Sequence, residues 1–157
     1  MVDICELLKY NEKIRRQYFD SFAQLSWEEF TKNREASFHS LRNIFIHTLN
    51  AVNHWLDFLE KEKEKPYPKF DEYKTFEDIR HYMERVEKRM SDYLQALSPA
   101  KLKETYMAAD DEGKPVEVTV EDVLIHVFEE EVHHRGEFIA LLWQMGIEPP
   151  MMSWKNL

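Results

Sequence analysis

The sequence predicts an all-α fold, a four-helix bundle in which a short irregular or hairpin excursion precedes the last helix. In four separate segments, apolar residues recur every three or four positions, which is the spacing of one face of a helix. Turn-forming residues separate these segments, and the whole chain contains only 3 Gly. Its 157 residues suffice for one sizeable core, so we expect residues 1–157 to form a single domain.

The first two helices are expected in the amino-terminal third of the chain. The first begins after Asp3, a suitable N-cap with Glu6 as its capping-box partner, and its apolar stripe continues to Leu25. The second begins near Ser37, and its pattern ends in alternating Glu and Lys at residues 60–65, ahead of Pro66. The two stripes consist of Ile4, Leu7, Leu8, Ile14, Tyr18, Phe22 and Leu25, and of Leu41, Ile44, Phe45, Thr48, Ala51, Val52, Trp55 and Leu59.

The third helix should begin at Thr75, which has Asp78 three residues on, and end before Ser98-Pro99. Residues 106–119 contain turn residues and then valines that alternate with polar residues, so a hairpin is expected there. The fourth helix should be capped by Thr119 and run to Met145, with Gly146 as its stop. The heptad of the third helix comprises Phe76, Ile79, Met83, Val86, Met90, Tyr93 and Leu97.

Composition argues against several classes of partner. Lys plus Arg number 21 against 30 for Asp plus Glu, and this formal net charge of −9 disfavours a surface that follows nucleic-acid phosphates. The one cysteine, Cys5, cannot form an intramolecular disulfide and is interpreted as a small hydrophobic residue, so a cytoplasmic location is expected. No stretch approaches the roughly 18–20 apolar residues of a membrane span, and the acidic start is unlike a secretory signal. We therefore expect neither nucleic acid nor a membrane as partner.

Two polar residues interrupt the apolar arc of the fourth helix. Glu130 and His134 lie inside it, with His126 and His133 at one edge and Glu131 at the other. Burial of an unpartnered carboxylate is costly, so Glu130 must be paired, protonated, hydrogen-bonded or bound to a cation. Side chains four residues apart on a helix have Cβ atoms about 5–6 Å from each other, close enough to share one ion. The apolar members of the arc are Val123, Val127, Phe138, Leu141 and Met145.

A third metal ligand is expected from the second helix. His47 lies at the border of its apolar stripe and is the best candidate, with His54 ranked second. The alternative is a hydrogen-bonded pair between Glu130 and His134 without any metal. Spacing alone gives the two interpretations equal weight, and the surrounding cluster of His and Glu favours the metal. The histidines expected to be exposed are His39 and His81.

Two segments resemble motifs of the DinB-like family of bacterial four-helix bundles. One is HVFEEEVHHRGE at residues 126–137, followed by LLWQMG at 141–146 and by Pro149-Pro150. The other is SLRNIFIH at residues 40–47, followed by Trp55-Leu56. The resemblance spans most of the chain. It implies a four-helix bundle that holds a divalent metal with three histidines, one from the second helix and two from the fourth.

Transferred by position, the resemblance places metal ligands at His47 and His134, and the middle histidine of the family pattern falls on Glu130. Two imidazoles and one carboxylate occur in hydrolytic zinc enzymes and in non-haem iron sites, so Zn, Ni, Fe and Mn are all candidate ions. His126, one turn earlier, is the alternative to Glu130 as a ligand. Gly136 is interpreted as a point of close approach to a neighbouring helix, and Glu137 as a rim residue of little consequence.

The resemblance also suggests a function, a metal-dependent transferase that activates a low-molecular-weight thiol. Glu131 and His133 are the candidate catalytic residues because they could move protons beside the ion. The alternative is a non-catalytic, stress-associated protein in which a structural ion ties two helices together or the pocket carries a small ligand. A third interpretation is a helical interaction module without metal. Whether the chain is an enzyme is left open, and a small-molecule thiol and a second copy of the chain are the expected partners.

Overall fold

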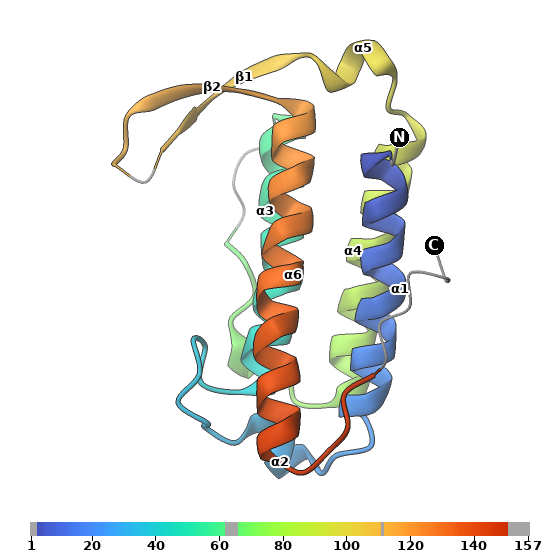
Figure 1. Cartoon of the computed structure of the whole chain (residues 1–157), viewed down its shortest axis with the longest axis vertical. Coiled ribbons are helices and arrows are strands. Elements are labelled where there is room, and N and C mark those ends of the chain that lie inside the picture. The colour runs from blue at the N-terminus through green and yellow to red at the C-terminus, as the bar shows by residue number, and fades with distance from the viewer. Residues whose placement is uncertain (1–2, 62–65, 111, 151–157) are drawn as a thin grey trace.

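A computed structural model describes residues 3–61, 66–110 and 112–150 and shows the expected helical bundle. Four long helices run alongside one another, and a hairpin projects from one end of the bundle while a short helix closes the other (Figure 1). Among the described residues, no helix is both long enough and apolar enough to cross a membrane. The elements are α1 (Ile4–Phe22), α2 (Trp27–Thr31), α3 (Leu41–Glu60), the 3-10 helix η1 (Phe70–Glu72), α4 (Phe76–Gln95), α5 (Pro99–Leu102), β1 (Thr105–Ala109), β2 (Pro115–Thr119) and α6 (Val120–Gln144).

Capping fixes the starts of α4 and α6 where the sequence predicts them. The Thr75 hydroxyl accepts a hydrogen bond from the backbone of Asp78, whose carboxylate accepts one in return from the backbone of Thr75. Thr119 and Asp122 form the same reciprocal arrangement at α6. The predicted end of α6 is also confirmed, because Gly146 follows the helix with a φ of +71°, a conformation that glycine adopts without strain.

The first two predicted helices are shorter than their apolar stripes. Helix α1 ends at Phe22, because Ser26 caps a separate helix, α2, by accepting a hydrogen bond from the backbone of Glu29 at 3.1 Å. Helix α3 begins at Leu41 and not near Ser37, because Ser40 is its N-cap and accepts from the backbone of Asn43. The alternating Glu and Lys after α3 fall largely on residues 62–65, outside the described residues.

Other local predictions differ from the structure in their details. Asp3 does cap α1, but Glu6 pairs with Lys9 and forms no capping box. Helix α4 ends at Gln95, two residues before the end of its heptad pattern. The predicted hairpin is confirmed: β1 and β2 are antiparallel, with Thr105 opposite Thr119.

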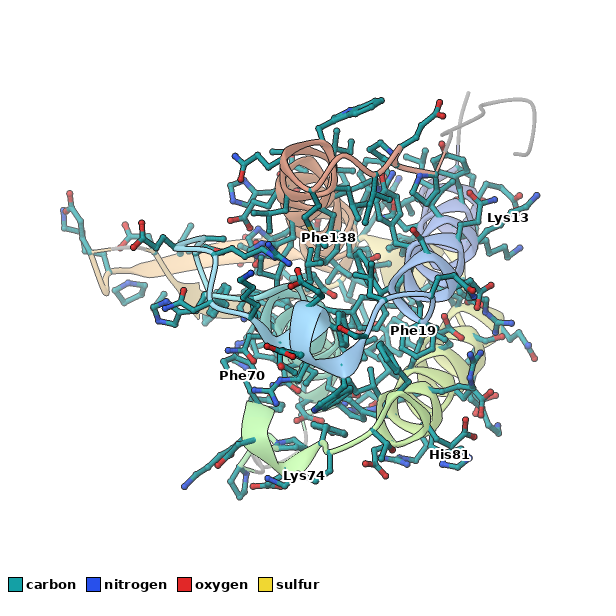
Figure 2. All side chains as sticks on the ribbon, turned by 90° about the horizontal axis from the view of Figure 1, so that it is seen from below. Lys13, Phe19, Phe70, Lys74, His81 and Phe138 are labelled. Carbon is teal, nitrogen blue, oxygen red and sulfur yellow. The ribbon has the colours of Figure 1, made fainter. Side chains whose placement is uncertain are left out.

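Aromatic side chains fill the centre of the bundle. Phe22 contacts Phe138 of α6 with ring centroids 5.0 Å apart, and Phe19 contacts Phe45 of α3 at 5.3 Å. Seen along the helices, Phe19 and Phe138 lie between the ribbons, whereas Lys13 and His81 lie at the periphery (Figure 2). These contacts join α1, α3 and α6, and so fix how α3 and α6 face each other.

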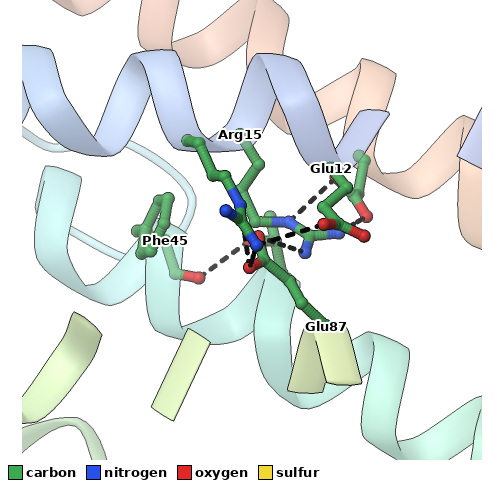
Figure 3. Close-up of polar contacts among 7 residues, drawn as sticks. Glu12, Arg15, Phe45 and Glu87 are labelled. Atoms are coloured by element: carbon green, nitrogen blue, oxygen red, sulfur yellow. Dashed lines mark hydrogen bonds and ion pairs between the residues drawn. The ribbon is translucent and has the colours of Figure 1, made fainter. Parts of the chain in front are cut away.

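One buried arginine crosses the interior between α1, α4 and α6. The Arg15 guanidinium donates two hydrogen bonds to the carboxylate of Glu131. It also lies 3.5 Å from the carboxylate of Glu87 (Figure 3). Its side chain is only 8% exposed. Burial raises the pKa of Glu87, although Arg15 and Arg16 oppose this effect. Arg15 therefore compensates two carboxylates that the fold has removed from water.

We predict that Arg15→Met lowers the free energy of unfolding by about 3–5 kcal/mol at neutral pH, because Glu87 and Glu131 lose a buried counter-charge. The loss should shrink as pH falls toward the ordinary Glu pKa of about 4.3. In the variant the pKa of the Glu87 carboxyl, which burial already raises, lies further above its unfolded value, so the folded protein gains stability when Glu87 is protonated and loses it as pH rises. Denaturant titrations across this pH range measure both effects.

Lys88→Met is the control, since Lys88 is 75% exposed and, within the described part of the chain, pairs with Asp92 of its own helix alone. It should change stability by less than about 1 kcal/mol. Equal losses in the two variants would contradict the role given to Arg15.

Candidate metal centre

The three predicted metal ligands meet between α3 and α6. The Nε2 atom of His47 lies 3.0 Å from Oε1 of Glu130, and the Nε2 atom of His134 lies 3.2 Å from the same oxygen. One ligand atom from each of the three side chains lies within 4.8 Å of the others. We call these three residues the triad. On a tetrahedral shell with bonds near 2.0–2.1 Å, donor atoms are separated by about 3.3–3.5 Å, so the spacing suits one ion.

A second carboxylate lies behind His134. Nδ1 of His134 is hydrogen-bonded to Glu137, which also accepts hydrogen bonds from the hydroxyl of Ser37 at 2.9 Å and from its backbone. Both nitrogens of His134 therefore face carboxylate oxygens. Without a metal, each of these two contacts needs a proton between the nitrogen and the oxygen. A cation in place of the Nε2 proton satisfies the same geometry with a neutral ring, as is usual for a metal-binding histidine held by a carboxylate.

Burial and charge keep the other two members of the triad in the protonation states that bind metals. Burial lowers the pKa of His47, despite the opposing effect of Glu130, and Phe38 stacks on its ring with centroids 3.9 Å apart. Burial alone would raise the pKa of Glu130, but hydrogen bonds and charge from His47 and His134 outweigh it, so that this pKa lies below its usual value. A neutral imidazole and an ionised carboxylate are the ligating forms.

The triad opens on one side into a groove along α3 and α6, which we call the α3–α6 groove. Its volume is about 340 Å³. The side chains of His47 and Glu130 are each 27% exposed, whereas that of His134 is 5% exposed. An ion held by the triad would therefore be reached from the His47–Glu130 side. The groove is lined by His47, Asn50, Ala51, His54, Trp55, Tyr67, His126 and Glu130.

The remaining candidate residues lie outside the triad. His126 is exposed, with its ring 4.9 Å from that of Trp55, and it lines the α3–α6 groove without joining the triad. His54 lines the same groove, and its Nδ1 lies 3.2 Å from the hydroxyl of Tyr67. His133 is exposed and groups with His134 and Glu137, on the far side of the His134 ring. The two remaining histidines, His39 and His81, are exposed as predicted.

Glu131, one of the two candidate catalytic residues, does not lie beside the triad. Its carboxylate is buried and bound by Arg15, so it faces α1 and not the triad. The cause is the helical angle of about 100° per residue, which sends Glu130 and Glu131 to different neighbours.

Two further expectations on α6 are corrected. Gly136 is exposed, and a Cβ built there would meet no heavy atom within 4 Å, so it marks no close approach to another helix. Glu137 is not inconsequential, because it holds His134. The sequence does contain a signal for this contact, because residues three apart on a helix are neighbours and Glu137 lies three residues after His134. Ser37 and Phe38 come from the loop before α3, and no periodic pattern in the sequence could have placed them here.

The sequence profile of the DinB family matches residues 1–156. The chain belongs to this family. A curated relative, the uncharacterised protein YizA of Bacillus subtilis strain 168, is 24% identical over 149 residues, covering 95% of this chain and 92% of that protein. The recognition made from the motifs at residues 40–47 and 126–137 is thus confirmed.

Solved structures of DinB-like proteins share the fold of this DinB-family chain. One from Bacillus cereus ATCC 10987 aligns with a TM-score of 0.74 and 18% identity, over 96% of this chain and 95% of that one. Another, YjoA from Bacillus subtilis, aligns with a TM-score of 0.66 and 15% identity, over 94% and 97% respectively. At these identities the likeness establishes the bundle architecture, and the site must be argued from the residues of this chain.

We predict that in the metal-free protein Glu137→Ala removes the proton from Nδ1 of His134 and leaves the proton on Nε2, because Nδ1 loses its carboxylate while Nε2 still faces Glu130. Long-range ¹H–¹⁵N correlation spectra report the protonation of each ring nitrogen. Glu129→Ala, at an exposed position of the same helix, is the control and should leave the His134 signals unchanged. Identical His134 spectra in wild type and Glu137→Ala would refute the orienting role.

Proposed function

We propose that this protein binds one divalent metal ion through Nε2 of His47, the carboxylate of Glu130 and Nε2 of His134. The observation that carries the proposal is the convergence of these three donors from two helices, with Glu137 fixing the orientation of His134. Three protein ligands leave at least one coordination position for water or substrate. The exposed edges of His47 and Glu130 direct that position toward the α3–α6 groove.

The donor set limits the identity of the ion. Two imidazole nitrogens and one carboxylate oxygen suit Zn²⁺, Fe²⁺, Ni²⁺ and Mn²⁺ better than Ca²⁺ or Mg²⁺, which prefer oxygen ligands. No cysteine lies in the triad, which argues against a closed structural zinc site built from thiolates.

We further propose that the bound ion serves a metal-dependent transferase reaction on a low-molecular-weight thiol, the activity that the family resemblance suggests. A divalent ion in the triad would lower the pKa of a bound thiol and hold it as a thiolate. Glu130 lies at Nε2 of His134 and Glu137 at Nδ1, so the ring is oriented with Nε2 toward the site. His54 and His126 line the adjoining groove and are the side chains there that can accept a proton released from the thiol.

The competing interpretation is a purely structural ion with a filled coordination shell. The α3–α6 groove favours an exchangeable site, because the two outer ligands of the triad take part in its wall. A structural ion would be enclosed and slow to exchange.

His47→Ala and His134→Ala should each abolish stoichiometric metal binding, because two remaining ligands cannot hold the ion firmly. Elemental analysis of protein purified without a histidine tag, together with calorimetric titration of Zn²⁺, measures the effect. Cys5→Ala and His126→Ala are the controls and should retain one ion per chain. Full occupancy in either histidine variant of the triad would remove the proposed ligand set.

Glu137→Ala should weaken metal binding by roughly 10- to 100-fold without abolishing it, as expected when the partner of a ligating histidine is removed. Competition with a chromogenic chelator gives the affinity. Unchanged affinity would separate Glu137 from the metal site even if the triad itself binds.

A further inference from the structure

The α3–α6 groove has a wall of aromatic rings beside the triad. The ring of Trp55 lies 4.9 Å from that of His126 on α6 and 5.1 Å from that of His54 on α3. The ring of Tyr67, which comes from the segment after α3, lies 6.0 Å from that of His54. These rings line the same groove as His47 and Glu130 of the triad, so a ligand on the ion would lie in a groove with aromatic surface.

Contacts outside the groove hold this wall in place. The Tyr67 hydroxyl donates a hydrogen bond to Oδ2 of Asp57 at 3.2 Å, and Asp57 is buried and paired with Arg89 at 2.7 Å. Trp55 also packs against Phe58, with centroids 5.8 Å apart. The hydroxyl of Tyr67 is hydrogen-bonded and the Trp55 ring is packed. A ligand would therefore lose little free energy to the ordering of these side chains on binding.

Charge along the groove disfavours an anionic ligand. Among the described residues that line it, none is Lys or Arg, and Glu130 is the one carboxylate. A divalent ion together with Glu130 leaves one positive charge, which a single thiolate would neutralise. Any second anionic group on the ligand would then lie beside Glu130 without a cationic partner among the described lining residues, which is unfavourable.

We infer that the α3–α6 groove selects small ligands whose metal-binding atom is attached to an uncharged aromatic body, and that Trp55 is the side chain that sets this selectivity. The inference rests on the proposed metal site and adds to it the class of substrate. Trp55 is a specificity residue here, since its ring would contact the body of the ligand and not the reacting atom.

The test compares three thiols on protein loaded with Co²⁺. The d–d absorption of Co²⁺ reports occupancy of the triad, and thiolate-to-cobalt charge-transfer absorption reports ligand binding. Benzyl mercaptan should bind at least tenfold more tightly than 4-(mercaptomethyl)benzoate, which has the same aromatic body and a second negative charge too far from the sulfur to chelate the ion. Trp55→Ala should weaken the binding of benzyl mercaptan roughly tenfold and leave the affinities for Co²⁺ and for 2-mercaptoethanol unchanged.

Trp143→Ala is the matched control, because Trp143 is 59% exposed on α6 and lies outside the lining of the groove. It should alter none of these affinities. Equal affinities for the three thiols, or equal effects of the two tryptophan variants, would overturn the inference.

Failure of the metal proposal is recognised separately, by the absence of d–d absorption. Binding of the aromatic thiol in the groove is then tested on metal-free protein, in which benzyl mercaptan should shift the indole N–H resonance of Trp55 and not that of Trp143. Absence of a Trp55 shift would overturn the selectivity inference, whatever the metal content.

Discussion

A carboxylate placed inside a helical bundle between two imidazoles is the constraint on which the site depends. One oxygen of Glu130 faces the Nε2 atoms of both His47 and His134 at hydrogen-bond distance. A second carboxylate, Glu137, takes the other nitrogen of His134. Carboxylate oxygens thus surround the two rings and favour positive charge between them. Protons provide this charge in the metal-free protein, and a single divalent cation would provide it in their place. The loop before α3 reinforces the arrangement, because Ser37 holds Glu137 and Phe38 covers His47.

Helix α6 serves two different polar systems with adjacent residues. Glu130 faces α3 and joins the triad, while Glu131 faces α1 and is neutralised by Arg15. Each carboxylate has its own hydrogen-bond partners, so each can be partly or fully removed from water. The separation also explains why an acidic run on one helix contributes one group to the candidate site and another to the stability of the bundle.

The triad has one covered side and one open side. His134 is covered, whereas the edges of His47 and Glu130 border a groove with a fixed aromatic wall. Such an arrangement suits a small ligand that approaches the ion with one donor atom and packs the rest of its body against the rings. The same groove lacks lysine and arginine among its described lining residues, so the ion itself would be the principal attraction for an anionic donor atom.

The order of amino acids alone dictates the helices and the inward position of the unusual pair on α6. Periodicity of three and four residues identifies the long helices, the Thr75 and Thr119 caps identify two of their starts, and the same periodicity places Glu130 and His134 on the core face. His47 was also within reach of this reasoning, because its place at the edge of a stripe marks it as facing a neighbour. These signals are local, so they are present in the chain before it folds.

Only the packing of the helices decided the rest. The partner of Glu131 depends on which helix lies beside that face of α6. The anchoring of Glu137 by Ser37 joins residues 100 positions apart in the chain. Likewise, the wall of the groove combines Trp55 of α3, His126 of α6 and Tyr67 of an intervening segment. Contacts of this kind arise from the relative positions of whole elements, and no residue spacing along the chain encodes them.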